Sequence, residues 1–268
     1  MTMGRDIDRL LVVLVAVAVL AAAAYVFLGM ASPPVVPANG TPVYGYRVVA
    51  NFSHDPTAFT EGLVFFQGYL YEGTGLYGKS GIRQYDLASG EVLKSLDLPQ
   101  QYFGEGITIL GGRLYQLTWQ SHKGFVYDLN FTLLQEFSYA TEGWGLTQNG
   151  SHLIMSDGSS TLYFLDPVAL TVVGQVQVTD NGNPVVYLNE LEYINGEVWA
   201  NVWQTDLIAR ISPQNGTVLG WVNLAGLLSP SDRAGADVLN GIAFDPAGSR
   251  ILVTGKYWPK IYQIELLP

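Results

Sequence analysis

Hydrophobic residues are distributed in two different ways along this chain. From Leu10 to Ala31 the sequence is apolar and uncharged. As a helix rising about 1.5 Å per residue, this run would cross a hydrocarbon core of about 30 Å. From Val43 onward, short apolar segments alternate with glycine-containing turns, a pattern that predicts β-strands and turns.

The N-terminal run predicts a transmembrane signal-anchor over residues 10–31. Arg5 and Arg9 precede it, and the next basic residue is Arg47. Positive charge favours the cytoplasmic side, so residues 1–9 are expected inside the cell and the remainder outside the membrane. Gly29-Met30-Ala31 also fits a cleavage site, so a secreted protein released from a signal peptide is the alternative. Residues 32–42 contain four prolines and are expected to form an extended linker.

A short phrase recurs through the remaining chain at intervals of roughly 45 residues, the spacing typical of propeller blades. It is found at Glu61-Gly62-Leu63, Glu105-Gly106-Ile107, Trp144-Gly145-Leu146, Asn189-Glu190-Leu191 and Asn240-Gly241-Ile242. Further strand-like segments and turns follow each phrase. Four short strands in each unit predict an all-β fold, a five-bladed β-propeller over residues 43–268.

The last repeat provides too few residues for four strands. Asn240 to Leu267 is short, whereas Val43 to Phe52 forms a spare strand before the first phrase. We therefore expect the N-terminal strand to complete the last blade and close the ring, because an open ring would expose unpaired sheet edges.

Composition narrows the function classes. The formal charge of −10 argues against a nucleic-acid partner. The chain has no cysteine, which excludes disulfides, thiolate metal sites and cysteine nucleophiles. The histidines form no short-spaced motif of the kind that binds zinc. A monomer is the default expectation.

Polar residues should converge where the five phrases meet near the propeller axis, together with aromatic neighbours. The expected set is Glu61, Glu105, Trp144, Asn189, Glu190 and Asn240, with Phe59, Phe103, Trp119 and Trp203. We expect the functional site at this mouth.

Several ordered motifs carry a resemblance to a known family. They include Phe59-Thr60-Glu61-Gly62-Leu63, Phe103-Gly104-Glu105-Gly106, Leu117-Thr118-Trp119, Glu142-Gly143-Trp144-Gly145-Leu146, Leu188-Asn189-Glu190-Leu191-Glu192, Trp199-Ala200-Asn201-Val202-Trp203 and Gly255-Lys256-Tyr257-Trp258-Pro259-Lys260. Together they resemble the plant and bacterial glutaminyl cyclases, a family of five-bladed propellers. The resemblance implies conversion of the N-terminal glutamine of peptides and proteins to pyroglutamate with release of ammonia.

The resemblance also implies roles for residues at the site. Glu105 would be the acid/base, assisted by Lys256 and Asn189, and these three form the expected catalytic set. The expected substrate-binding residues are Glu61, Phe59, Phe103, Trp119, Trp144 and Trp203. At Glu61 many family members carry glutamine, so a neutral donor is replaced here by a carboxyl group. A protonated Glu61 could still donate a hydrogen bond, whereas an ionised Glu61 could attract a cation or the substrate's ammonium.

The resemblance implies catalysis without a required cofactor or metal, with a structural calcium ion as an option in the channel. Two alternatives are a calcium-dependent lactonase-type propeller, because oxygen ligands suit a hard cation, and a non-catalytic propeller that binds peptides.

Overall fold

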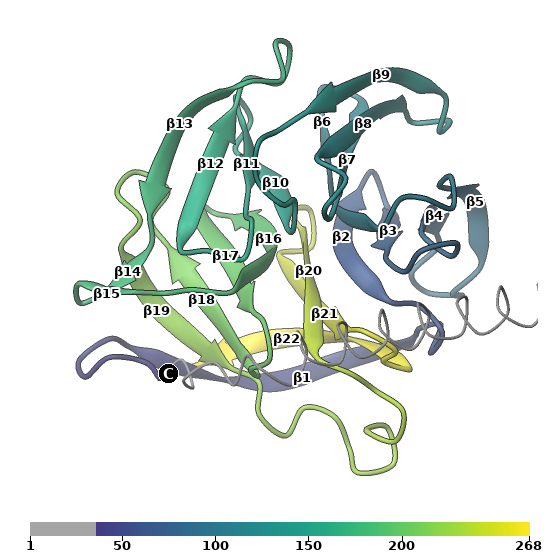
Figure 1. The fold of residues 1–268 in the computed structure, drawn as a ribbon. Helices are drawn as coiled ribbons and strands as arrows, with labels where there is room; N and C mark the ends of the chain where they lie inside the picture. Colours follow the sequence, from purple (N-terminus) through teal and green to yellow (C-terminus); the bar gives the residue numbers. More distant parts are fainter. Residues whose placement is uncertain (1–35) are drawn as a thin grey trace, which may run out of the picture. The chain divides into compact units, whose positions relative to one another are not determined.

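The computed structural model describes residues 36–268, and within this range all regular secondary structure is β-strand (Figure 1). The transmembrane segment predicted for residues 10–31 and the cytoplasmic stretch 1–9 lie outside the described residues. Among the described residues, no helix has the length and apolar character needed to span a membrane.

Three sheets are antiparallel and four-stranded, and their strands pair in sequence order. The first contains β2 (Thr60–Phe66), β3 (Tyr69–Thr74), β4 (Gly81–Tyr85) and β5 (Val92–Asp97). The second contains β6 (Gly104–Leu110), β7 (Arg113–Thr118), β8 (Lys123–Asp128) and β9 (Leu133–Ser138). The third contains β10 (Leu146–Gln148), β11 (Leu153–Met155), β12 (Thr161–Leu165) and β13 (Val172–Gln177). The separate hairpin of β14 (Thr179–Asp180) and β15 (Asn183–Pro184) was not predicted.

A fourth, eight-stranded sheet joins the last two repeats. Its order is β16-β17-β18-β19-β1-β22-β21-β20. The strands are β16 (Leu188–Ile194), β17 (Glu197–Val202), β18 (Leu207–Ile211), β19 (Val218–Asn223), β1 (Val43–Ser53), β22 (Lys260–Leu267), β21 (Arg250–Gly255) and β20 (Leu239–Asp245).

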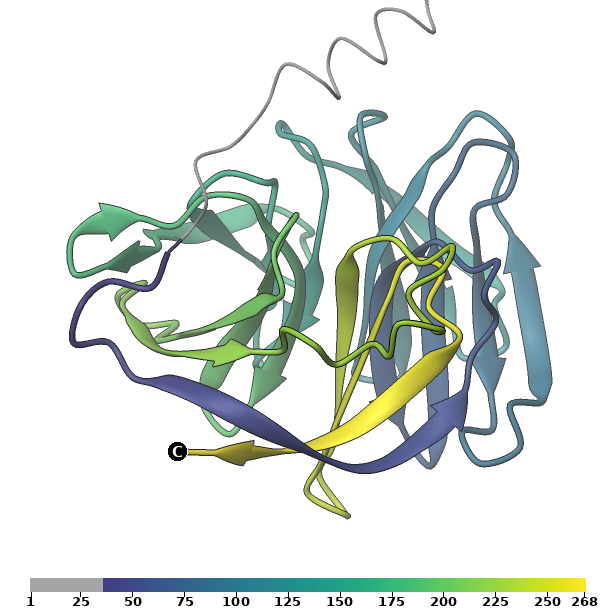
Figure 2. The same ribbon diagram turned by 90° about the horizontal axis from the view of Figure 1, so that it is seen from below.

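Strand β1 joins the two halves of this sheet, because it lies between β19 and β22 (Figure 2). It pairs antiparallel with β22 from Gly45 opposite Leu267 to Ser53 opposite Lys260, as expected for the spare N-terminal strand. Its first residues also pair in parallel with β19, where Val43 lies opposite Trp221. The sequence pattern did not predict this second pairing, because it depends on how neighbouring sheets meet.

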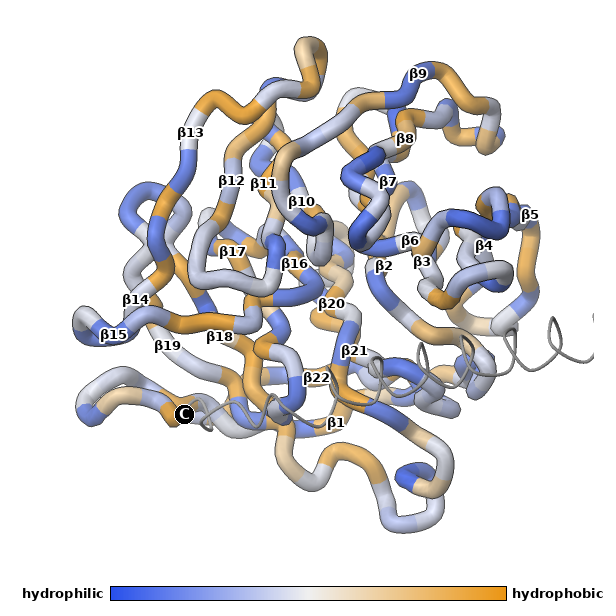
Figure 3. Tube along the Cα trace, viewed as in Figure 1, coloured by the Kyte–Doolittle hydropathy of each residue, from blue (hydrophilic) through white to orange (hydrophobic). Residues whose placement is uncertain are grey.

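The first strands of the repeats, β2, β6, β10, β16 and β20, contact one another in cyclic order in the middle of the described domain, a propeller-like arrangement (Figure 1). Hydrophobic and hydrophilic stretches follow one another along the chain (Figure 3). Inner strands β2, β6, β16 and β20 are almost wholly buried, whereas β5, β9 and β13 are largely exposed.

Apolar side chains fill the spaces between neighbouring sheets. Ile82 of β4 packs in one cluster with Ile107 of β6, and Tyr115 of β7 packs in another with Leu146 of β10. Burial of each large side chain contributes about 1.5–3 kcal/mol. The middle of the domain therefore remains free for polar side chains.

The residues before β1 are attached to the domain. Ala38 N donates to Asp180 Oδ2 at 2.8 Å, and the Thr41 hydroxyl donates to Asp180 Oδ1. Trp221 Nε1 donates to the same buried carboxylate at 2.9 Å. The extended linker expected over 32–42 is thus hydrogen-bonded to the domain from Ala38 onward.

Candidate active site

Two glycines bring the inner strands into close contact. Gly106 donates its N–H to the Trp144 carbonyl oxygen at 2.7 Å, and a Cβ at Gly106 would lie 2.5 Å from the Leu146 nitrogen. A Cβ at Gly145 would lie 1.9 Å from the Asn189 carbonyl oxygen. Any larger residue would separate the strands, so these glycines keep the backbones beside Glu105, Trp144 and Asn189 in contact.

Glu61 and Lys256 form a buried ion pair. Lys256 Nζ donates to Glu61 Oε1 at 2.7 Å, and Asn240 Nδ2 donates to Glu61 Oε2 at 3.1 Å. The ammonium also lies 4.3 Å from the centre of the Phe59 ring. Burial raises the pKa of Glu61 to about 7, although Lys256 acts in the opposite direction. The structure thus brings together Glu61 and Lys256, two residues that the resemblance places at the site.

Glu105 is buried, and its carboxyl group makes no hydrogen bond to any residue within 36–268. Burial raises the pKa of Glu105 well above its ordinary value, and the negative charges of Glu61 and Glu142 add to this effect. Lys256 opposes the increase. The group therefore lies within electrostatic reach of the Glu61–Lys256 pair, and its surroundings favour the protonated form.

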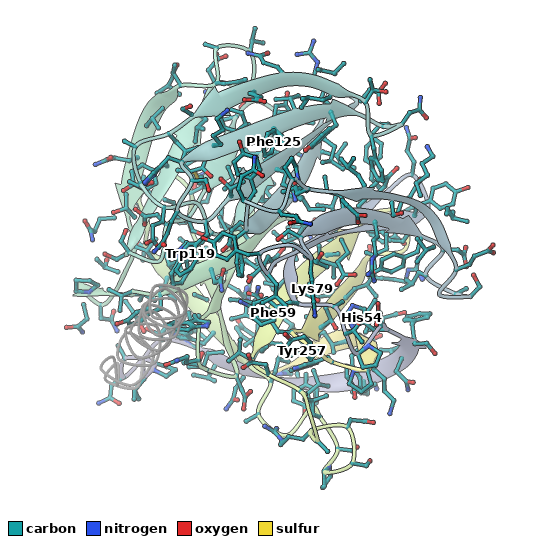
Figure 4. The ribbon with its side chains drawn as sticks, turned by 45° about the vertical axis from the view of Figure 1, so that its right-hand side comes forward. His54, Phe59, Lys79, Trp119, Phe125 and Tyr257 are labelled. Atoms are coloured by element: carbon teal, nitrogen blue, oxygen red, sulfur yellow. The ribbon has the colours of Figure 1, made fainter. Side chains whose placement is uncertain are left out.

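Aromatic rings line one side of this region. Phe59 contacts Tyr257 edge-to-face at 5.1 Å between ring centres, and the two lie next to each other in Figure 4. Phe59 also contacts Phe103 at 6.0 Å, and Phe103 contacts Trp119 at 5.6 Å. These contacts join the residues directly before β2 and β6 to the turn after β7.

A second aromatic group comes from the later repeats. Trp144 and Trp203 meet edge-to-face with ring centres 5.8 Å apart, and Tyr187 lies 6.0 Å from Trp203. Glu142 connects this group to the first one, because its Oε2 accepts hydrogen bonds from Trp119 Nε1 and Trp144 Nε1 at 2.8 and 3.0 Å. The five aromatic side chains predicted for the site thus belong to linked groups: Phe59, Phe103, Trp119, Trp144 and Trp203.

Asn189 and its neighbour Glu190 differ in their surroundings. Asn189 is 3% exposed, and its Oδ1 has no hydrogen-bond partner among the described residues. Glu190 instead accepts hydrogen bonds from the N–H groups of Leu63 and Ile242 at 3.2 and 2.8 Å. Glu190 therefore holds β16 against β2 and β20, whereas the Asn189 amide remains able to contact a ligand.

The sequence interpretation missed several residues of this site. Glu142 and Tyr257 occurred in quoted motifs but were not selected, and Tyr187 was not considered. Glu142 precedes Gly143-Trp144, just as Glu61 precedes Gly62, and this parallel was the available signal.

The donor set does not resemble a calcium site. Calcium requires several converging oxygen ligands. Here the carboxylates of Glu61 and Glu190 accept hydrogen bonds from nitrogen donors. Within residues 36–268, no group of three or more His, Cys, Asp or Glu side chains is arranged to hold a metal ion.

Comparisons with known proteins agree with one another. The family model described as glutamine cyclotransferase matches residues 19–266. The chain is 53% identical over 228 residues to a glutaminyl-peptide cyclotransferase from Arabidopsis thaliana, covering 82% of this chain and 71% of the relative. It is also similar to the crystal structure of Myxococcus xanthus glutaminyl cyclase, with 35% identity and a TM-score of 0.76. That match covers 84% of this chain and 98% of the other.

Proposed function

We infer the reaction mechanism from a plain premise: the chain belongs to the glutamine cyclotransferase family. It is a glutaminyl-peptide cyclotransferase, which converts an N-terminal glutamine to pyroglutamate and releases ammonia. Both alternatives, the lactonase-type hydrolase and the non-catalytic binding propeller, give way to this assignment.

The observation that carries the proposed mechanism is the Glu105 carboxyl group, which is buried, has no hydrogen-bond partner among the described residues, and has a raised pKa. Such a group is suited to accept and return a proton near neutral pH. We assign it the role of acid/base.

The reaction is an intramolecular displacement. The substrate's α-amine forms a bond to the side-chain carbonyl carbon and transfers a proton to ionised Glu105. Protonated Glu105 then gives the proton to the side-chain nitrogen as the bond between this nitrogen and the carbonyl carbon breaks. The products are the five-membered lactam and ammonia. The site favours this step by holding the glutamine in a folded conformer and excluding water.

Asn189 and Lys256 support this step in the proposal. We assign the side-chain NH₂ group of the buried Asn189 the role of donor to the carbonyl oxygen, which gains negative charge in the tetrahedral intermediate. Lys256 orients Glu61 and moderates the pKa of Glu105. The linked aromatic groups enclose the glutamine side chain.

The five-bladed count is also a proposal. It divides the eight-stranded sheet into one blade of β16 to β19 and one blade of β20, β21, β22 and β1. The antiparallel pairing of β1 with β22 supports this division.

We propose that the reaction needs no metal and that residues 10–31 tether the enzyme outside the cytoplasm or are cleaved to release it. The proposal that no metal is needed rests on the Glu105 carboxyl group, which can carry the proton itself. It also rests on the carboxylates of Glu61 and Glu190, which already accept hydrogen bonds from nitrogen donors. The second rests on the apolar run after Arg5 and Arg9. A monomer acting on peptides remains the default.

The full chain, supplied with a peptide that begins with glutamine, tests the mechanism. Ammonia release and the loss of one ammonia from the peptide mass are measured with and without a chelator, and an N-acetylated peptide serves as the blank. Glu105→Gln is expected to lower kcat by about 10²–10⁴-fold while the protein stays folded. Glu91→Gln, which removes a charge from an exposed turn, should be fully active. Near-normal activity of Glu105→Gln would overturn the acid/base assignment, and loss of activity with chelator would overturn metal independence.

A further inference from the structure

Glu142 lies at the junction of two sheets. It belongs to the connection between β9 and β10, two residues before Trp144, whereas Trp119 follows β7 of the neighbouring sheet. One carboxylate oxygen accepts both indole N–H groups, and the other oxygen accepts from Gln120 Nε2 at 2.9 Å. Glu142 therefore has three donors, and its carboxylate is held in a fixed place.

The two indoles depend on this carboxylate for their only polar contact among the described residues. Each indole has one N–H donor, and an unpaired donor in a largely apolar wall is costly. The Trp119 ring contacts Phe103, and the Trp144 ring contacts Trp203. Glu142 consequently orients both aromatic groups. It holds Trp119 and Trp144 by hydrogen bonds, and these two rings contact Phe103 and Trp203.

Glu142 also acts on Glu105 through its charge. Burial is the main cause of the raised pKa of Glu105, Glu61 adds to it from β2, and Glu142 adds to it from the β9–β10 connection. Lys256, from the β21–β22 connection, lowers it. The Tyr139 phenol is the remaining titratable group that interacts with Glu105.

We propose that Glu142 is a positioning residue of the cyclisation: its carboxylate fixes the Trp119 and Trp144 indoles as one wall and brings a negative charge within electrostatic reach of Glu105. This inference rests on the proposed role of Glu105 as acid/base. Glu142 itself does not exchange a proton with the substrate.

Two substitutions separate the two parts of this role. Glu142→Gln keeps an oxygen acceptor for the indoles but removes the charge, whereas Glu142→Leu removes both. Glu91→Gln is the charge-matched control on an exposed turn. For each variant, kcat, KM and the pH profile of kcat/KM are measured on a glutamine-initiated peptide, and the indole N–H resonances are recorded by NMR.

We expect Glu142→Leu to shift the Trp119 and Trp144 resonances and to reduce kcat/KM by roughly 10²-fold, the cost of a small misplacement in the site. Glu142→Gln should keep both resonances near their normal positions and recover most of the activity. Its acidic limb should move to lower pH, because a negative charge that favours protonated Glu105 is gone. The substrate amine titrates identically in every assay, so this difference reports the enzyme.

The proposal is overturned if Glu142→Leu retains kcat/KM within about twofold of the normal enzyme, the level of a surface substitution. It is also overturned if the pH profile of Glu142→Gln matches that of Glu91→Gln. Failure of the acid/base assignment would look different, since Glu105→Gln would then be active whatever the Glu142 variants do.

Discussion

Lys256 Nζ lies 2.7 Å from Glu61 Oε1, and both side chains are almost completely buried. The pair connects inner strand β2 to the segment after β21, so it joins the first repeat to the last. The carboxyl group that replaces the glutamine of many family members thus has an ammonium partner.

Removal of Lys256 should destabilise the fold. Lys256→Met leaves the buried Glu61 carboxylate without its ammonium, which costs about 3–5 kcal/mol in the free energy of unfolding. Adding Glu61→Gln should restore most of this loss, because the uncompensated charge disappears. Urea unfolding of the two single variants and the double variant at pH 8 measures the coupling. No recovery in the double variant would assign the loss to the contact with the Phe59 ring instead.

Glu192 should make stability depend on pH. Burial raises its pKa from 4.5 to about 8, against hydrogen bonds from Phe244 N–H and the Thr147 hydroxyl. Between these values the folded state holds a proton that the unfolded state has lost, so stability falls as pH rises from about 4.5 to about 8. The slope is at most about 1.4 kcal/mol per pH unit.

Glu192→Gln removes that titration. The variant should gain stability relative to the normal protein as the pH rises from 5 to 8, and Glu91→Gln should show no such trend. Urea unfolding at four pH values in this range makes the comparison. Parallel curves for Glu192→Gln and the normal protein would contradict the raised pKa.

The aromatic wall should contribute mainly through substrate binding. Trp203→Leu removes the edge-to-face contact with Trp144 and the tilted ring contact with Tyr187. We expect kcat/KM to fall about tenfold or more, because the glutamine side chain loses an enclosing ring. Tyr69→Leu, at an exposed aromatic residue of β3, serves as the control. Equal activities of the two variants would remove Trp203 from the site.

His54 should be an imidazolium ion inside the fold. Its Nδ1 faces the Trp258 carbonyl oxygen at 2.6 Å, and its Nε2 faces Glu72 Oε1 at 2.9 Å, so both nitrogens need a proton. Burial alone would lower the pKa of His54, but the Glu72 carboxylate outweighs burial and raises it. The same pairing lowers the pKa of Glu72.

His54→Gln should therefore cost about 3 kcal/mol near pH 6, where the ion pair is complete. The stabilisation by His54 is full below pH about 6.5 and is lost as pH rises through its higher folded pKa. Unfolding at pH 6 and pH 9, with exposed His122→Gln as control, tests this. A cost that is equal at both pH values would contradict the charged state.

The repeat phrases predicted the inner strands well because each combines a small residue with strand-forming neighbours, and this local pattern requires close packing at the middle. For the same reason they predicted that Glu61, Glu105 and Asn189 lie on inner strands, here β2, β6 and β16. Glu142 was missed because its two indole donors, Trp119 and Trp144, come from different repeats. The parallel pairing of β1 with β19 and the Ala38–Asp180 hydrogen bond were missed likewise, since no local pattern encodes contacts between distant segments.

The position of β1 also determines when the domain can finish folding. The strand is made early, yet its partners are Trp221 in β19 and the residues from Lys260 to Leu267 in β22. Such non-local pairing is slow, because the entropy of closing a long loop is lost before any stabilising contact forms. The first three sheets can form while synthesis proceeds, whereas β1 waits with unpaired edges until the last strand arrives. The last step of folding is therefore the pairing of β1, the first strand synthesised, with β22, the last one.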